Sequence, residues 1–340
     1  MPRAFPGDSA PLFYLVYGLT LRSNAPFPHL PVSSHESYDV DVDLAGEMSF
    51  EELPAGAVVH PDGAAVVIEA DGGRVVRYRN PREGNAVQLH FNRDGSRVRV
   101  VWKAGVVVDG IPAAVMGPLL GTCIRLRGVV LLHSGAVVVD AGAVLLMGAP
   151  GAGKSTTTAA LMKRGHPVLT EDIAALDPRD EGVWVQPGPR RIRLLTDVAL
   201  ALGATLSDWP PLLSDVPSNS AKQLLDSGGL FQGEPVRATM LCFLERTMEG
   251  SPRPALVPLS VKETVPRLLQ NLFIRGRPDR ELSSRAFRTC VRLANTCRSF
   301  AVRGALRLED LNELADLIAS AASAASAGSV APGETAARPG

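Results

Sequence analysis

The sequence predicts an α/β protein with a β-rich N-terminal part and a C-terminal part in which strands and helices alternate. Up to residue 105, β-prone segments recur at a spacing of roughly ten residues between turn signals such as Asp71-Gly72-Gly73. From residue 129 onward, short apolar runs alternate with segments of helical spacing. A glycine-rich loop at residues 148–155 stands between one such run and one such helix. Together these features favour an α/β core preceded by a β-rich domain.

Composition and spacing divide the chain into five expected segments. They are a flexible arm at 1–10, a β-rich domain at 11–108, a linker helix at 109–128, an α/β domain at 129–318 and a disordered tail at 319–340. The helix is expected because Val115, Leu119 and Cys123 recur at helical spacing. The tail is expected to be disordered because it is rich in Ala, Ser, Gly and Pro.

The β-rich domain is expected to form an antiparallel sheet of meander type. The segments that carry β signals are 12–17, 38–44, 65–69, 74–78, 86–91 and 98–102. Asp39, Asp41 and Asp43 alternate with apolar residues, so the three carboxylates share one face of a strand. Such a row can hold a metal ion, but a solvated sheet face is the interpretation we favour.

The glycine-rich loop reads Gly-Ala-Pro-Gly-Ala-Gly-Lys-Ser and matches the phosphate-binding pattern G-x-x-x-x-G-K-[ST]. Lys154 can reach the β- and γ-phosphates of a nucleotide, and Ser155 can hold Mg²⁺. A buried strand at 143–147 precedes the loop, and a helix at 156–164 places its positive end under the phosphates. This context argues against a chance match in a Gly-rich chain. The expected nucleotide-binding residues are Gly148, Ala149, Pro150, Gly151, Ala152, Gly153, Lys154, Ser155 and Thr156.

An acidic pair follows the loop helix. Gly165 and Pro167 end that helix, Val168 begins a short strand, and Glu171 and Asp172 stand at the end of the strand. A carboxylate at this place can orient Mg²⁺ or accept a proton from an attacking hydroxyl. The alternative is that Asp172 only caps a turn or helix that begins at the next residue.

Other candidate groups are weaker. His133 follows an apolar run, and a lone histidine at a strand end is more often structural than catalytic. Arginines are frequent between 275 and 307, where we favour a solvated face with surface ion pairs over an arginine finger. Arg190, Arg191 and Arg193 are better placed in the sequence to contact a nucleotide or substrate.

Composition excludes several classes of function. The 35 basic and 35 acidic residues cancel, so nothing indicates bulk affinity for nucleic acid or an anionic membrane. No apolar stretch is long enough to span a membrane, and the N-terminus lacks the apolar core of a signal peptide. The four cysteines show no C-x-x-C pairing, so a zinc site is not expected. We expect a cytoplasmic protein with reduced thiols.

The block from His133 to Asp172 resembles bacterial HPr kinase/phosphorylase without gaps. The resemblance implies a P-loop kinase core of HPr-kinase type as the catalytic domain at 129–318. It implies that Lys154 and Ser155 bind ATP and Mg²⁺, that His133 is an active-site residue, and that Asp172 accepts the proton of a substrate serine. On this basis the catalytic residues are Asp172, His133, Lys154 and Glu171, and the metal residues are Ser155 and Asp172.

The chain also departs from that family. Thr156 stands where the family usually has Glu, and Glu171 stands where it usually has Asp. The later acidic-Arg-Gly signature is not found, although Asp197 lies in the corresponding region. We therefore do not expect the reverse, phosphorolytic activity, or HPr itself as the substrate.

A narrower resemblance extends further along the chain. The segments Tyr17 to Pro28 and Pro187 to Leu194 look like those of lasso peptide kinases, which phosphorylate a serine near the C-terminus of a precursor peptide. It implies an ATP- and Mg²⁺-dependent serine kinase whose partner is a peptide or protein. The question of whether the protein forms a homo-oligomer stays open. Two alternatives also stay open: a nucleotide-gated peptide-binding module without turnover, and a kinase of a small metabolite.

Overall fold

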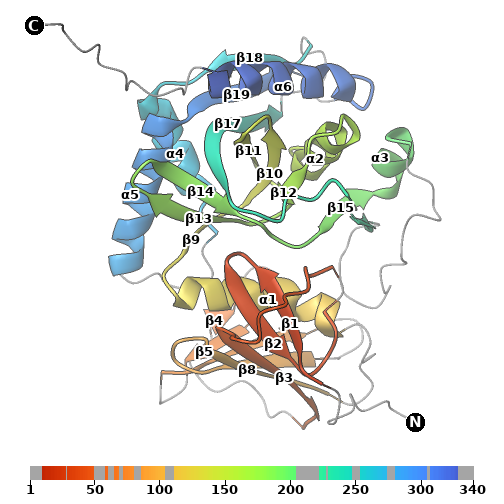
Figure 1. The fold of residues 1–340 in the computed structure, drawn as a ribbon, viewed down its shortest axis with the longest axis vertical. Coiled ribbons are helices and arrows are strands. Elements are labelled where there is room, and N and C mark those ends of the chain that lie inside the picture. The colour runs from red at the N-terminus through yellow and green to blue at the C-terminus, as the bar shows by residue number, and fades with distance from the viewer. Residues whose placement is uncertain are drawn as a thin grey trace, which may run out of the picture.

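A computed structural model of the 340-residue chain describes residues 10–27, 29–49, 58–59, 65–68, 72–79, 86–103, 111–203, 222–226, 229–246, 253–273, 280–304 and 307–327. The protein is a mixed α/β protein with two large sheets (Figure 1). Almost all of the arm expected at 1–10, the end of the tail at 328–340 and the whole stretch at 204–221 lie outside the described residues.

The N-terminal sheet has eight strands in the order β1-β2-β3-β8-β7-β6-β5-β4. The strands are β1 (Leu12–Val16), β2 (Leu19–Ser23), β3 (Val40–Glu47), β4 (Val58–Val59), β5 (Ala65–Ile68), β6 (Arg74–Arg79), β7 (Ala86–Phe91) and β8 (Arg97–Trp102). Strands β4 to β8 form the antiparallel meander that the sequence predicts.

The prediction of a purely antiparallel sheet is wrong at β3. This strand pairs in parallel with both β2 and β8. The segment between β2 and β3 is long enough to return the chain to the starting edge, and such a connection permits parallel pairing. Strand β2 was also missed by the sequence analysis, because its alternation of Leu with polar residues is short.

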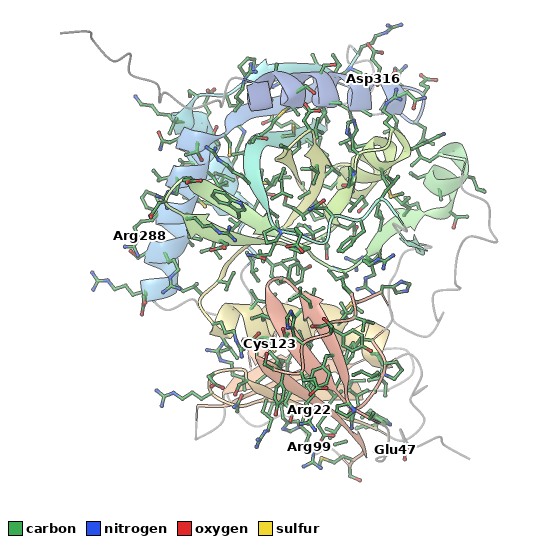
Figure 2. The ribbon with its side chains drawn as sticks, in the orientation of Figure 1. Arg22, Glu47, Arg99, Cys123, Arg288 and Asp316 are labelled. Carbon is green, nitrogen blue, oxygen red and sulfur yellow. The ribbon has the colours of Figure 1, made fainter. Side chains whose placement is uncertain are left out.

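Helix α1 (Ile111–Leu126) covers the face of the N-terminal sheet that is turned toward the central sheet (Figure 1). Leu119 and Cys123 of this helix are fully buried, together with Leu89 and Val100 of the sheet. The opposite face is polar, and Figure 2 places Arg22 and Arg99 there. The Asp41 carboxylate pairs with Arg22 at 3.3 Å, as expected of a solvated face.

The remaining acids of that row also have protein partners. Asp43 accepts a hydrogen bond from Asn24 at 3.0 Å, and Asp39 accepts one from the backbone of Thr20 at 2.8 Å. Within the described residues, no group of three or more His, Cys, Asp and Glu side chains is arranged to hold a metal ion.

The central sheet has nine strands in the order β12-β10-β11-β17-β14-β13-β9, with β19 beside β17 and β18 beside β19. Its strands are β9 (Val130–Leu132), β10 (Ser134–Val139), β11 (Gly142–Met147), β12 (Val168–Thr170), β13 (Ala174–Arg179), β14 (Gly182–Gln186), β17 (Val236–Arg246), β18 (Ala255–Pro258) and β19 (Arg298–Gly304). The strands β11, β17 and β19 run parallel. A separate ribbon joins β15 (Arg191–Leu195) to β16 (Lys222–Asp226).

Helices cover both faces of the central sheet. They are α2 (Lys154–Lys163), α3 (Thr196–Ala201), α4 (Val261–Gln270), α5 (Arg280–Thr296) and α6 (Leu311–Ala327). On β11, Val144 and Leu146 pack into the cluster that holds α2 and α6, whereas Leu145 and Met147 pack into the cluster that holds α4 and α5. This division explains why the strand is apolar at every position.

One helix boundary is set by a cap, and another differs from the prediction. Helix α4 begins at Val261, because the N–H of Ser260 is capped by the Glu263 carboxylate at 2.9 Å. Helix α6 continues to Ala327, past the predicted end of the domain at residue 318. Its Ala322 and Ala325 side chains are buried, so part of the predicted disordered tail is a packed helix. No helix in the described ranges has the length and apolar character needed to cross a membrane.

Candidate functional site

The glycine-rich loop lies at the carboxyl end of β11, where the chain turns into α2 (Figure 1). Two of its residues need glycine. Gly148 has a φ of 153°, and a Cβ there would stand 2.8 Å from the carbonyl oxygen of Leu244. Gly153 has a φ of 98° immediately before the helix. Other residues rarely adopt these conformations, so the loop sequence and the loop shape agree.

Lys154 folds back over the loop. Its Nζ donates to the carbonyl oxygens of Gly148 at 2.7 Å and Ala149 at 3.3 Å, and the residue is only 9% exposed. The ammonium group is therefore held on the loop in a desolvated position. A charged phosphate oxygen is a stronger acceptor than a neutral carbonyl, so the same group is suited to hold a phosphate.

Ser155 meets the first acid of the predicted pair. Its Oγ donates to Oε1 of Glu171 at 2.5 Å, and the Glu171 residue is buried. Glu171 lies directly after β12, and β10 separates β12 from β11 in the sheet. The sequence analysis assigned Asp172 to the metal together with Ser155, but the acid in contact with Ser155 is Glu171.

The donor set beside Ser155 is suited to Mg²⁺. This ion is coordinated by oxygen, and in nucleotide sites it takes one or two protein ligands and completes its shell with water and substrate phosphates. A hydroxyl and a carboxylate at 2.5 Å from each other provide such ligands. The set fits a magnesium ion shared with a nucleotide, and it lacks the nitrogen and sulfur ligands that zinc prefers.

Asp172 is held between two basic side chains. Its Oδ2 accepts from Nη2 of Arg193 at 2.5 Å, and its Oδ1 lies 3.4 Å from Nδ1 of His133. The same His133 nitrogen lies 3.0 Å from the backbone oxygen of Asp172. The backbone N–H of His133 donates to the carbonyl oxygen of Asn271 at 2.7 Å, which fixes the segment that carries the imidazole.

The surroundings of Asp172 keep it ionised. Burial acts to raise the pKa of this carboxyl, but the nearby Arg193, together with His133 and Lys154, outweighs burial and holds the pKa below its ordinary value. In return, Glu171 and Asp172 raise the pKa of Arg193. The site therefore contains a carboxylate that is charged at neutral pH and directed by fixed partners.

Strand β15 supplies the arginines. Arg191 and Arg193 alternate with the buried Ile192 and Leu194, so both guanidinium groups extend from one face of the strand toward the acidic pair. Burial and the neighbouring Arg193 lower the pKa of Arg191. The sequence analysis singled out this segment, but it could not assign Arg193 to Asp172.

Several predicted residues therefore meet at one place. They are His133, Lys154, Ser155, Glu171 and Asp172. The alternative in which Asp172 caps a helix is wrong, because residues 174–179 form strand β13. Ala149, Pro150, Gly151 and Ala152 complete the loop, and Thr156 lies in the first turn of α2. The roles of all these residues in binding and catalysis stay predictions.

The arginines near the C-terminus are engaged elsewhere. Arg285 pairs with Glu281 at 3.2 Å, Arg303 with Glu245 at 3.1 Å and Arg307 with Glu309 at 3.3 Å. Figure 2 shows Arg288 on the outer side of α5. These contacts agree with a solvated face and surface ion pairs.

The sequence analysis missed one residue of the N-terminal domain. Tyr17 is at the tip of the β1–β2 hairpin, and its side chain is hydrogen-bonded to Thr170, the last residue of β12. Glu171 and Asp172 follow directly. The unusual Tyr-Gly turn between two β-prone segments was the available signal.

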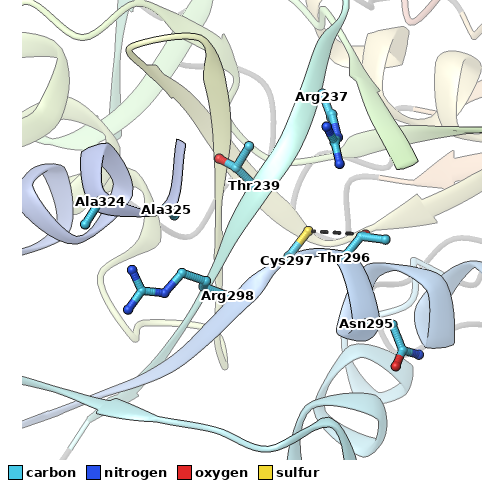
Figure 3. A pocket seen from close by; sticks show the side chains of 8 residues that line it. All are labelled: Arg237, Thr239, Asn295, Thr296, Cys297, Arg298, Ala324 and Ala325. Atoms are coloured by element: carbon cyan, nitrogen blue, oxygen red, sulfur yellow. Dashed lines mark hydrogen bonds between the residues drawn. The ribbon is translucent and has the colours of Figure 1, made fainter. Parts of the chain in front are cut away.

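A separate cavity of about 470 Å³ opens at the amino end of β17 (Figure 3). Arg237 and Thr239 line it from the start of β17, with Cys297 and Arg298 from the start of β19. Burial raises the pKa of the Cys297 thiol to about 12, so this thiol is protonated and a poor nucleophile. The cavity contains none of the predicted site residues.

Comparison with known proteins gives one similarity in sequence. Over 74 residues the chain is 35% identical to the HPr kinase/phosphorylase of Geobacillus sp. strain WCH70. The match spans 22% of this chain and about a quarter, 24%, of that relative. No family model matches the chain. The chain is thus similar to HPr kinase/phosphorylase over a limited part of its length.

The similarities also include solved structures. The Hpr(Ser) kinase/phosphatase from Coxiella burnetii matches 56% of this chain and 95% of its own, with 14% sequence identity and a TM-score of 0.29. Because that score is low, the fold given above rests on the strands and helices of this chain alone.

Proposed function

We propose that this protein is an ATP- and Mg²⁺-dependent kinase that phosphorylates a serine of a peptide or protein. The observation that carries the proposal is the position of Asp172. Its carboxylate is held between His133 and Arg193, next to a phosphate loop with a buried lysine and a serine bonded to Glu171. The sequence similarity to HPr kinase/phosphorylase supports the same class of reaction.

Each residue of the site has a role that follows from its position. The loop amides and Lys154 hold the phosphates of ATP, and the bound metal would neutralise charge on the transferred group. Ser155 and Glu171 would supply the oxygen ligands for Mg²⁺. Asp172 accepts the proton of the serine hydroxyl while the serine oxygen bonds to the γ-phosphorus and the bond to the β-phosphate oxygen breaks. ADP and the phosphoserine are the products.

The low pKa of Asp172 is compatible with this role. Phosphoryl transfer passes through a loose transition state, in which the acceptor hydroxyl needs to be aligned more than deprotonated early. A charged carboxylate accepts a hydrogen bond from that hydroxyl and directs its oxygen. His133 and Arg193 keep the carboxylate in place, and Arg193 also adds positive charge beside the phosphoryl group.

The proposal also includes the identity of the phosphate acceptor. We propose a serine in a peptide, with the precursor of a lasso-type peptide as the specific candidate, because the segments 17–28 and 187–194 resemble the kinases of such precursors. Both segments lie at the site: Tyr17 approaches the acidic pair, and Arg193 binds it. Their closeness to the acids supports a role in presenting the acceptor.

The proposal is tested with purified protein, Mg²⁺, ATP and candidate serine peptides, analysed by mass spectrometry. We expect one added phosphate on serine and stoichiometric formation of ADP. A protein that binds ATP but leaves every precursor peptide unmodified would be a binding module instead. Addition of inorganic phosphate to the phosphopeptide should release little pyrophosphate, because the downstream signature of the reverse reaction is missing.

A further inference from the structure

The turn at the tip of the β1–β2 hairpin is strained. Val16 pairs with Leu19, so Tyr17 and Gly18 alone form the turn, with φ values of 54° and 75°. Two-residue turns with positive φ at both positions favour Asn-Gly or Asp-Gly. A tyrosine in the left-handed region is disfavoured, because its Cβ comes too close to the following carbonyl oxygen. Strain of this kind persists where the surrounding structure fixes it, and it is frequent at functional sites.

Tight contacts with the other domain hold this tip. The backbone N–H of Tyr17 donates to the carbonyl oxygen of Pro187 at 2.7 Å, and the residue is 6% exposed. Gly188 leaves room for the ring, since a Cβ there would lie 2.9 Å from Cε1 of Tyr17. Gly18 is equally close to Gln186, whose Oε1 would lie 3.1 Å from an added Cβ. The hairpin tip is therefore seated in the segment that leads into β15.

The N-terminal domain also holds both flanks of the acidic pair. On one side, Thr170 is bonded to the Tyr17 side chain. On the other side, Ile173 is 5% exposed and packs into the hydrophobic cluster of the N-terminal sheet and α1. The Thr170 hydroxyl donates to the backbone oxygen of Ile173 at 2.7 Å, which closes the turn that contains Glu171 and Asp172.

We propose that Tyr17 is a positioning residue of the kinase site: the hairpin tip of the N-terminal sheet holds the Glu171–Asp172 turn so that Asp172 faces the acceptor. The proposal rests on the proposed function. The hydroxyl of Tyr17 acts through Thr170 and does not touch the reacting atoms. Burial raises the pKa of Tyr17, so its phenol stays protonated and available as a donor at neutral pH. The N-terminal sheet is then a part of the catalytic unit.

The chain offers a matched control for this residue. Tyr14 is also buried, at 5% exposed, but its Oη accepts a hydrogen bond from the backbone of Phe27 at 3.0 Å, inside the N-terminal domain. Tyr17→Phe and Tyr14→Phe each remove one buried hydroxyl from the same sheet. Only the first removal affects the acidic pair.

The kinetic test compares these two variants and Thr170→Val. We expect Tyr17→Phe to lower kcat about 3- to 10-fold, the scale of one net hydrogen bond, with the KM for ATP unchanged. Thr170→Val loses this bond and also the bond to the backbone oxygen of Ile173, so it should lower kcat at least as much, and the double variant should be no slower than Thr170→Val alone. Tyr14→Phe should keep the wild-type kcat. Equal loss in the two tyrosine variants, or none in Tyr17→Phe, would overturn the proposal.

A second measurement does not depend on turnover. His133 lies 3.4 Å from the Asp172 carboxylate, so its imidazole resonances in an NMR spectrum report the position of the turn. We expect these resonances to shift in Tyr17→Phe and not in Tyr14→Phe. If the protein transfers no phosphate and the shift still occurs, the proposed function fails and the positioning role stands. Unchanged His133 resonances in Tyr17→Phe contradict the positioning role whatever the activity.

Discussion

Two of the arginine–aspartate pairs in this chain lie in different regions but have nearly the same exposure. On the N-terminal sheet, Arg22 and Asp41 are 3.3 Å apart and their side chains are 39% and 27% exposed. Beside the phosphate loop, Arg193 and Asp172 are 2.5 Å apart and are 39% and 38% exposed. The first pair stabilises a solvated face, whereas we assign the second to catalysis. Exposure alone therefore does not separate a surface pair from a site.

The surroundings of the two pairs differ. Asp41 lies in a regular strand, with arginines opposite it on both neighbouring strands. Asp172 follows a strand end and is influenced by three basic residues from separate segments, Arg193, His133 and Lys154. Charges brought together from distant parts of a chain have to be held there by the fold. The comparison suggests that convergence beside a glycine-rich loop is what marks the functional pair.

The largest effect is expected from a substitution in the phosphate loop, compared with a substitution elsewhere in helix α2. Lys154→Ala should abolish phosphoryl transfer and strongly weaken ATP binding, because each charge-assisted contact to phosphate contributes roughly 1.5–3 kcal/mol. Lys163→Ala is the matched control, since Lys163 is an exposed lysine in the last turn of the same helix. Transfer rates and nucleotide affinity by calorimetry check both variants. Wild-type transfer in Lys154→Ala would refute the site.

A smaller effect is expected at Glu171. Glu171→Gln keeps a hydrogen-bond partner for Ser155 but removes the negative charge, so the site should need about 10- to 100-fold more Mg²⁺. Titration of activity with MgCl₂ measures this shift, and saturating Mg²⁺ should restore most of the rate. A variant with wild-type Mg²⁺ dependence would mean that Glu171 does not serve the metal.

The pair at the site should also contribute to stability in a pH-dependent manner. Arg193 holds the pKa of Asp172 below its ordinary value of 3.8, so the pair stabilises the folded state fully above that pH. This contribution is lost as the pH falls through the lowered, folded-state pKa. Arg193→Gln should therefore reduce the free energy of unfolding at pH 7 by about 1–2 kcal/mol, less than for a deeply buried pair. Urea unfolding should show that the difference in the free energy of unfolding between the wild type and Arg193→Gln becomes smaller below pH 3.8. A difference that becomes larger there would contradict the prediction.

The smallest effect is expected on the N-terminal sheet. Asp41→Asn removes the charge that faces Arg22 on a solvated face, and we expect a change of at most about 0.5 kcal/mol in stability. The transfer rate should not change. Thermal melting at low and high salt provides the measurement. A loss as large as that of Arg193→Gln would show that the two pairs are not different in kind.

The parts that could be predicted from sequence are those whose structure is local. The phosphate loop is contiguous, and its glycines specify its backbone, so residues 148–155 could be assigned before the fold was known. The acidic pair could be placed at a strand end because Gly165 and Pro167 stop the preceding helix. Arg193 reaches Asp172 from β15, a strand remote from β12 in the sequence, and no local pattern indicates that contact.

The same reasoning explains the errors. Regular spacing of β segments suggests hairpins, but it does not reveal that β3 pairs in parallel with two neighbours. Composition suggested disorder after residue 318, yet Ala has the highest helix propensity and the small side chains pack closely at the end of α6. Tyr17 was missed because its partner Thr170 is remote in sequence.

The central claim is that Asp172 directs the acceptor serine in phosphoryl transfer, and single-turnover kinetics with a serine peptide test it most directly. Asp172→Asn should lower the transfer rate about 10²- to 10⁴-fold while ATP affinity stays close to that of the wild type. Asp41→Asn, measured beside it, should transfer phosphate at the wild-type rate. If Asp172→Asn transfers phosphate normally while Glu171→Gln is inactive even at saturating Mg²⁺, the assignment of the two acids is wrong.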